Sequence, residues 1–307
     1  MLKRILVAIP IVIIVALALF VQSWVLAVFA VVLGCMSQFE IVRAMDGNGK
    51  PVVKTVSFLF AGILAALFLV DFGNRQAWGP FTASYFTPTT VLVLFVALTM
   101  TTFIAAMFSK RHTAESVGNT VLTLVYPQML LALFYALILT FAYPHYVHDW
   151  FDVFHHYDEP YTGQLVMLLM VFLPAMFSDT FAYFFGMAFG KRKLCPQISP
   201  KKTVAGCVAG IIGGVVAALL IWLVFDNMIY LSGHYIVMGP LVNYLAAGGI
   251  LAAISQFGDL SASFLKRALG IKDFGKLLPG HGGVMDRIDS VIFCIPVVFI
   301  LSMTAII

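Results

Sequence analysis

Charged side chains are scarce in this chain. Asp, Glu, Lys and Arg make up 10% of its 307 residues, whereas 62% of the residues are hydrophobic. A typical soluble domain carries about 25% charged residues, and one water-soluble core could not bury this much apolar surface. The scarcity of charge therefore excludes a soluble domain and predicts an all-α polytopic membrane protein. The net charge of +4 gives no sign of a nucleic-acid partner.

Cysteine is also rare and forms no recognisable pattern. The four cysteines are Cys35, Cys195, Cys207 and Cys294. Their spacing matches neither a zinc site nor a redox pair. Three of them fall in apolar runs, where cysteine is typically a small packing residue. We therefore expect no disulfide.

The basic, apolar start of the chain lacks the small-residue cleavage site of a secretory signal, so we interpret it as a retained first span. Apolar runs of about 20 residues predict nine membrane-spanning helices in all. Pro127 and Pro174 are expected to kink the fifth and sixth helices, because proline removes a backbone donor. The predicted spans are 5–21, 24–42, 55–72, 89–109, 117–143, 164–190, 204–225, 238–257 and 288–307.

The positive charges predict the orientation of these spans. With the N-terminus inside and the C-terminus outside, all of the 18 Lys and Arg residues except Arg75 fall in cytoplasmic segments, as the positive-inside rule requires. We divide the chain into an N-terminal region, 1–163, and a C-terminal catalytic region, 164–307, with a cytoplasmic loop at 258–287. The outer loop 144–163 contains His145, His148, His155 and His156. An interfacial loop explains it better than a metal site, because the histidine spacing matches no known site.

Two polar segments on the predicted cytoplasmic side suit a phosphorylated ligand. In 177–186, Asp179 interrupts an apolar helix, and a charge inside a bilayer is costly enough to indicate function. An acid that reaches water at the membrane edge is the plainer alternative. In 191–203, the basic residues 191–193 are explained as an anchor to anionic lipids. The following SPKKT, 199–203, is predicted to open a helix, whose N-terminus with adjacent lysines would bind phosphate.

The third polar segment, 258–290, contains most of the remaining charge. Asp259 closes the eighth predicted span, and Asp286 and Asp289 should project from one face of the ninth. Glycines at 280, 282 and 283 allow the backbone to approach a ligand closely. Carboxylates beside basic residues at a membrane surface indicate a divalent metal that holds phosphates. A solvated loop with one helix-capping Asp would leave the other acids unexplained.

The third segment resembles the signature of the phosphatidate cytidylyltransferases, also called CDP-diacylglycerol synthases. In that signature Lys-Arg is followed by Lys-Asp and then by P-G-H-G-G-x-x-D-R-x-D. The S-D-T-x-A-Y and S-P-K-K-T segments resemble the same family in the same order. Many members carry Glu where this chain has Ala205 and Ala262. The matching residues are Ser263, Lys266, Arg267, Lys272, Asp273, Pro279, Gly280, His281, Gly282, Gly283, Asp286, Arg287 and Asp289.

The resemblance implies a reaction in which CMP passes from CTP to phosphatidate, giving CDP-diacylglycerol and pyrophosphate. It implies Mg²⁺, with a second cation as an open alternative, and a homodimer among the lipids of a bacterial inner membrane, with its active site facing the cytoplasm. The implied metal ligands are Asp259, Asp286 and Asp289. The implied catalytic residues are Lys266, Arg267, His281 and Arg287. Substrate or phosphate binding is implied for Asp179, Tyr183, Ser199, Lys201, Lys202, Thr203, Lys272, Asp273, Gly282 and Gly283.

Alternatives from other classes stay open. A divergent family member acting on another lipid phosphate or nucleotide would fit, since the acids at Ala205 and Ala262 are missing. A transporter would explain nine spans, but we see neither inverted repeats nor polar residues through the midplane. A CDP-alcohol phosphatidyltransferase would carry D-G-x-x-A-R, which the sequence lacks.

Overall fold

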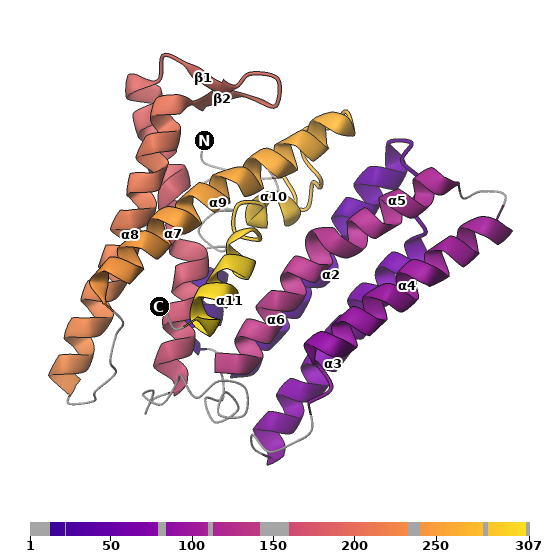
Figure 1. Ribbon diagram of the computed structural model, residues 1–307, viewed down its shortest axis with the longest axis horizontal. Coiled ribbons are helices and arrows are strands. Elements are labelled where there is room, and N and C mark those ends of the chain that lie inside the picture. Colours follow the sequence, from indigo (N-terminus) through magenta and orange to yellow (C-terminus); the bar gives the residue numbers. More distant parts are fainter. Residues whose placement is uncertain are drawn as a thin grey trace. The chain divides into compact units, whose positions relative to one another are not determined.

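The computed structural model describes residues 13–21, 23–78, 84–109, 113–141, 160–232, 240–278 and 282–304 (Figure 1). The chain divides into two compact units. The first comprises Met1–Leu139 and Lys266–Ile288, and the second comprises Thr140–Leu265 and Asp289–Ile307. The segment that resembles the family signature thus folds with the N-terminal helices. The division of the chain after residue 163 stays a prediction.

The first unit is a bundle of apolar helices. Its helices are α2 (Ser23–Gly47), α3 (Lys54–Trp78), α4 (Pro88–Phe108), α5 (Ala114–Thr123), the π-helical η1 (Leu124–Met129), α6 (Leu130–Phe141) and the short α10 (Met285–Ile288). Aromatic rings fill its centre, where Phe68 stacks on Tyr135 with 4.6 Å between ring centroids. The predicted kink at Pro127 is confirmed, because Tyr126 leaves helical geometry with φ −118° and ψ 108°.

The second unit is built on two long helices that pack along their length. It contains α7 (Pro160–Phe189), strands β1 (Lys193–Cys195) and β2 (Ser199–Thr203), α8 (Val204–Ser232), most of α9 (Leu241–Ala268) and α11 (Cys294–Met303). Gly206 allows α8 to approach α7 closely, since a Cβ there would lie 2.7 Å from the carbonyl oxygen of Ala182. Such small-residue contacts are typical of helices that pack in membranes. α7 continues as one helix through Pro174.

The SPKKT segment forms a strand, which corrects the prediction that it opens a helix. β1 and β2 pair as an antiparallel hairpin at one end of α7 and α8, with Lys193 opposite Thr203 (Figure 1). α8 begins only at Val204, and the Thr203 hydroxyl caps it by accepting a hydrogen bond from the Gly206 N–H at 3.1 Å. The residue that caps the helix is Thr203. Lys201 and Lys202 therefore precede the helix and do not lie in its first turn.

α9 is longer than predicted. It continues beyond the expected end at residue 257 to Ala268, so Asp259, Ser263 and Lys266 lie on one continuous helix. The helix ends where Gly270 adopts a left-handed φ of +68°. The Gly270 and Ile271 N–H groups then donate to the carbonyls of Arg267 and Lys266. The helix therefore ends at this glycine cap and not at the earlier point where the apolar content of the sequence falls.

The helix predicted at 288–307 is interrupted. α10 ends at Ile288, the chain turns through Asp289–Phe293, and α11 begins at Cys294. The Asp289 carboxylate accepts a hydrogen bond from the Ser290 N–H at 3.0 Å, a local bond that competes with helix formation. The expected shared helix face for Asp286 and Asp289 is therefore wrong, because only Asp286 lies within a helix.

Seven described helices are long and apolar enough to cross a membrane, counting α5, η1 and α6 as one. They correspond to the second to eighth predicted spans. Of the first predicted span the structure describes residues 13–21, which are helical. α11 is apolar but shorter than a full span. The chain is thus an all-α polytopic membrane protein, with one small β-hairpin among the residues that the structure describes. The count of nine spans and the orientation stay predictions.

Candidate functional site

The second unit contains a pocket of about 570 Å³ beneath the β-hairpin. α7 contributes Asp179 and Tyr183, the hairpin contributes Lys193, Lys201, Lys202 and Thr203, and α9 contributes Gln256 and Asp259. Residues from the two polar segments, 177–186 and 191–203, therefore meet in one pocket with Asp259, whereas Lys266, Asp286, Arg287 and Asp289 do not line it. Three lysines and two carboxylates in an open cavity suit a ligand that carries several phosphates.

An ion pair joins the hairpin to α9 inside this pocket. The Lys202 ammonium lies 2.6 Å from a carboxylate oxygen of Asp259, and about a quarter of each side chain is exposed. Ser263, one helical turn further on, donates a long hydrogen bond of 3.5 Å to Asp259. Both charges stay accessible to solvent, so either partner could exchange the other for a ligand.

Asp179 is held at the pocket edge by the turn that precedes α11. Its carboxylate accepts a hydrogen bond from the Ser290 hydroxyl at 3.1 Å, and Gly258 packs closely against the backbone oxygens of this turn. The Tyr183 side chain is 65% exposed one turn further along α7. Asp179 is itself exposed, and this hydrogen bond orients its carboxylate at the pocket edge.

Lys193 belongs to the pocket, which the sequence did not predict. We had grouped it with Lys191 and Arg192 as a membrane anchor. Pairing of β1 with β2 places Lys193 opposite Thr203, and Lys193 lines the pocket whereas Lys191 and Arg192 do not. Lys193 is the first residue of β1 and Lys191 and Arg192 precede the strand, and no pattern in the sequence marks where the strand begins.

The signature segment of the first unit is organised around Asp286. This side chain is almost fully buried, and its Oδ2 accepts hydrogen bonds of 2.9 Å from the N–H groups of Phe274 and Gly283. Its Oδ1 accepts a third, also 2.9 Å, from the Lys266 ammonium. The Lys266 ammonium also lies 5.4 Å from the ring centroid of Phe274. Asp286 thus ties the end of α9 to both arms of the loop that follows it.

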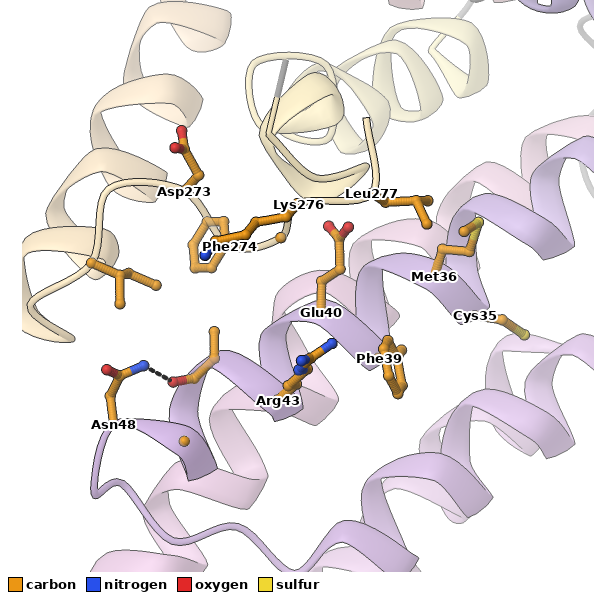
Figure 2. A pocket seen from close by; sticks show the side chains of 14 residues that line it. Cys35, Met36, Phe39, Glu40, Arg43, Asn48, Asp273, Phe274, Lys276 and Leu277 are labelled. Carbon is orange, nitrogen blue, oxygen red and sulfur yellow. Dashed lines mark hydrogen bonds between the residues drawn. The ribbon is translucent and has the colours of Figure 1, made fainter. Parts of the chain in front are cut away.

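A second acid holds the same loop from α2. Glu40, which we had not selected from the sequence, accepts hydrogen bonds from the N–H groups of Val284 and Met285. Figure 2 shows its carboxylate directed at the loop, beside a pocket of about 720 Å³ between α2 and residues 271–277. The signal that could have found it is a single acid late in an apolar run.

The remaining predicted residues lie mostly at the surface. Ser199 is half-buried in β2, and Gly282, with a φ of +83°, pairs with Leu278 in an isolated bridge. Gly283 is buried. His281 lies outside the described residues. The exposed members are Arg267, Lys272, Asp273 and Arg287.

Two carboxylates of the second unit fit a magnesium ion. Mg²⁺ in phosphate-binding sites is typically held by one or two carboxylates together with water and substrate oxygens. Asp179 and Asp259 line one pocket with three lysines and match that donor set. Asp286 differs, since both of its oxygens already accept hydrogen bonds. Among the described residues, no three His, Cys, Asp or Glu side chains gather as a protein-only metal site.

Apolar helices that carry lysines and carboxylates in one pocket define a membrane protein suited to phosphorylated ligands. A profile of the cytidylyltransferase family matches residues 2–305. The chain therefore belongs to the cytidylyltransferase family.

Curated relatives align with part of the chain. A phosphatidate cytidylyltransferase of Haemophilus influenzae is 39% identical over 178 residues, which cover 58% of this chain and 56% of that protein. One of Staphylococcus aureus strain COL is 38% identical over 149 residues, covering 48% of this chain and 53% of the relative. One of Staphylococcus epidermidis is 35% identical over 148 residues, with the same two coverages. The chain thus aligns with about half the length of each relative.

Proposed function

We propose that the chain transfers CMP from CTP to phosphatidate, giving CDP-diacylglycerol and pyrophosphate. Family membership and the names of the relatives support the reaction class. The observation that carries the proposal is the pocket in which Lys193, Lys201 and Lys202 meet Asp179 and Asp259. A nucleoside triphosphate with a divalent cation matches this mixture of charges, because the cation binds carboxylates and the lysines bind the remaining phosphate oxygens.

The chemistry needs little acid–base help from the protein. An oxygen of the phosphatidate phosphate attacks the α-phosphorus of CTP, and the bond from that phosphorus to the β-phosphate oxygen breaks, which releases pyrophosphate. A phosphate monoester has a second pKa near ~6, so the nucleophile is mostly dianionic at neutral pH. The protein must bring two anions together and stabilise the leaving group, which is a task of positioning and electrostatics.

We assign the triphosphate to the pocket of the second unit. Lys201, Lys202 and Lys193 hold its non-bridging oxygens, and Asp259 with Asp179 binds Mg²⁺. When bound, Mg²⁺ neutralises charge on the phosphates and favours departure of pyrophosphate. The Lys202–Asp259 pair keeps these two side chains in place at the pocket. The metal roles predicted for Asp286 and Asp289, the second cation and the homodimer stay predictions.

One structural observation favours the alternative of a divergent family member that acts on another lipid phosphate or nucleotide. Ala262 is fully buried in α9, where family members often carry Glu. A glutamate at this position would need buried partners, so this chain has replaced an acid by a packing residue. The alternative reading is a family member that uses a different lipid phosphate or nucleotide.

A direct assay distinguishes the proposed reaction from a reaction with another lipid phosphate or nucleotide. Purified protein with labelled CTP, phosphatidate and Mg²⁺ should form CDP-diacylglycerol and pyrophosphate in equal amounts, and chelation of Mg²⁺ should stop the reaction. Parallel reactions with ATP, or with another lipid phosphate in place of phosphatidate, serve as controls. Faster turnover of a control substrate would favour the alternative, and no turnover of any pair would contradict the enzyme proposal.

The membrane face follows from the substrates. Phosphatidate stays in the bilayer and CTP stays in water, so the site must lie where headgroups meet the cytoplasm. We therefore propose that the pocket lies at the inner face of a bacterial inner membrane. In the same assay, sealed inside-out vesicles should use added CTP, and sealed right-side-out vesicles should use it only after permeabilisation. The reverse result would place the pocket on the outer face.

The hairpin offers a matched pair of lysines to test the triphosphate assignment. Lys193→Ala should raise the KM for CTP about tenfold or more, because a lysine at a partly dehydrated phosphate site interacts more strongly than one in open water. Lys191→Ala, two residues away and outside the pocket, should change this KM less than about twofold. Steady-state kinetics with varied CTP measures both. Equal effects of the two variants would remove the triphosphate from the hairpin pocket.

A further inference from the structure

Glu40 is a buried acid that the proposed chemistry does not use. It lies in the apolar helix α2, and its side chain is 6% exposed. A carboxylate in such surroundings is costly unless strong hydrogen bonds compensate for the lost water. The hydrogen-bond partners of Glu40 lie far away in the sequence. Glu40 therefore makes a tertiary contact and does not cap its own helix.

Two backbone groups of the signature segment supply those hydrogen bonds. The Val284 N–H donates to Oε1 at 3.0 Å, and the Met285 N–H donates to Oε2 at 2.8 Å. The preceding N–H group, of Gly283, donates to Asp286. Three consecutive backbone donors are thus satisfied by two carboxylates, just where the loop turns into α10. Hydrogen bonds to a charged acceptor are shorter and stronger than neutral ones.

The segment is also shaped to admit the Glu40 carboxylate. A Cβ added at Gly275 or at Gly283 would come closer than 3.0 Å to its carboxylate oxygens. The segment therefore approaches Glu40 at two places, once at Gly275 and once at Gly283. Figure 2 shows the carboxylate between α2 and the chain that carries Lys276 and Leu277.

We propose that Glu40 is a positioning residue for cytidylyl transfer. It touches no reacting atom and acts through the signature segment, whose shape fixes the Lys266–Asp286 pair and the adjacent glycines. This inference rests on the proposed function, because it assigns the segment a part in the reaction. A displacement of about 1 Å at a reacting group can lower the rate about 10²-fold, so a loosened segment should act on turnover.

Glu40→Gln tests the proposal with almost no change in shape. The amide keeps one acceptor oxygen but turns an N–H₂ group toward a backbone N–H, so one of the two hydrogen bonds is lost. We expect kcat per folded protein to fall about 10- to 100-fold. The KM for CTP should change less than about threefold, because the lysine pocket belongs to the other unit. Asp46→Asn, on the same helix but in a partly exposed ion pair with Lys54, should leave both constants unchanged.

Gly275→Ala provides a second route to the same effect without removing Glu40. The added methyl should push the Glu40 carboxylate away from the Val284 and Met285 N–H groups, since the end of a flexible side chain moves more easily than backbone. Gly275→Ala should therefore lower kcat in the natural sequence and have little further effect in a Glu40→Ala background. Equal effects of Gly275→Ala in both backgrounds would show that the methyl does not act through Glu40.

Hydrogen–deuterium exchange measures how well the Glu40 contact protects the backbone amides, independently of activity. The backbone amides of residues 284 and 285 should exchange at least about tenfold faster in Glu40→Gln than in the natural sequence or in Asp46→Asn. Unchanged exchange, or faster exchange with unchanged kcat, would overturn the positioning role. If the natural sequence itself makes no CDP-diacylglycerol, the proposed function fails, and the exchange result still decides whether Glu40 holds the segment.

Discussion

Asp259→Asn is expected to lower kcat about 10²–10³-fold while leaving the protein folded, since this is the typical cost of losing one preorganised electrostatic group. The substitution keeps the shape of the side chain and removes the charge that we assign to Mg²⁺. The cost in stability should be small, because the Lys202–Asp259 pair is partly exposed and pairs of that kind contribute about 0–1 kcal/mol. The activity loss should shrink as Mg²⁺ is raised.

The measurement is kcat at several Mg²⁺ concentrations, together with the melting temperature of the purified protein. Glu115→Gln is the matched control, because Glu115 forms an ion pair of similar length with Lys50 on an exposed surface. The control should match the natural sequence in both assays. Wild-type turnover of Asp259→Asn at every Mg²⁺ concentration, or a loss of turnover that does not change with Mg²⁺, would remove Asp259 from the metal role.

Much of the second unit's pocket could be predicted from the sequence. Asp179 and Asp259 stand out in the sequence as acids in or at the end of an apolar helix. Lys201 and Lys202 are predicted from a helix N-terminus, which the structure replaces by strand β2. The structure brings all four to one pocket. The membrane class and seven of the predicted spans also follow from composition and run length, since these signals are local in the sequence.

The parts that depend on tertiary contacts could not be predicted. Lys193 joins the pocket through strand pairing, and Glu40 meets partners 244 and 245 residues away in the sequence. Neither strand pairing nor a long-range hydrogen bond produces a periodic pattern in the sequence. The end of α9 was placed too early, because hydropathy falls after residue 257, whereas hydrogen bonding ends the helix only near Gly270. The break after α10 was missed for a similar reason, since the local bond between Asp289 and Ser290 competes with the helix.

Asp259 and the signature acid Asp286 should therefore differ in what their loss affects. Asp259 stands in a partly open pocket, and its loss should affect turnover. Asp286 is 7% exposed and satisfies two backbone N–H groups as well as Lys266. Its loss should affect folding as well as turnover, because an ammonium would remain in a mostly buried place without its charge partner. The same Asp→Asn change thus separates a ligand-binding acid from an acid that organises a loop.

Asp286→Asn is expected to destabilise the protein by about 3–5 kcal/mol, the usual cost of breaking one side of a buried pair, and to abolish most turnover at every Mg²⁺ concentration. Adding Lys266→Met should restore part of the melting temperature, because the double variant no longer buries an unpaired charge. It should not restore turnover, because the double variant lacks both the Lys266 ammonium and the Asp286 charge, even though an Asn oxygen in place of Oδ2 could still accept from Phe274 and Gly283. Melting curves and kcat of the two single variants and the double variant complete the cycle. An Asp286→Asn protein that melts like the natural sequence but needs more Mg²⁺ would contradict the loop role and restore Asp286 to the metal site.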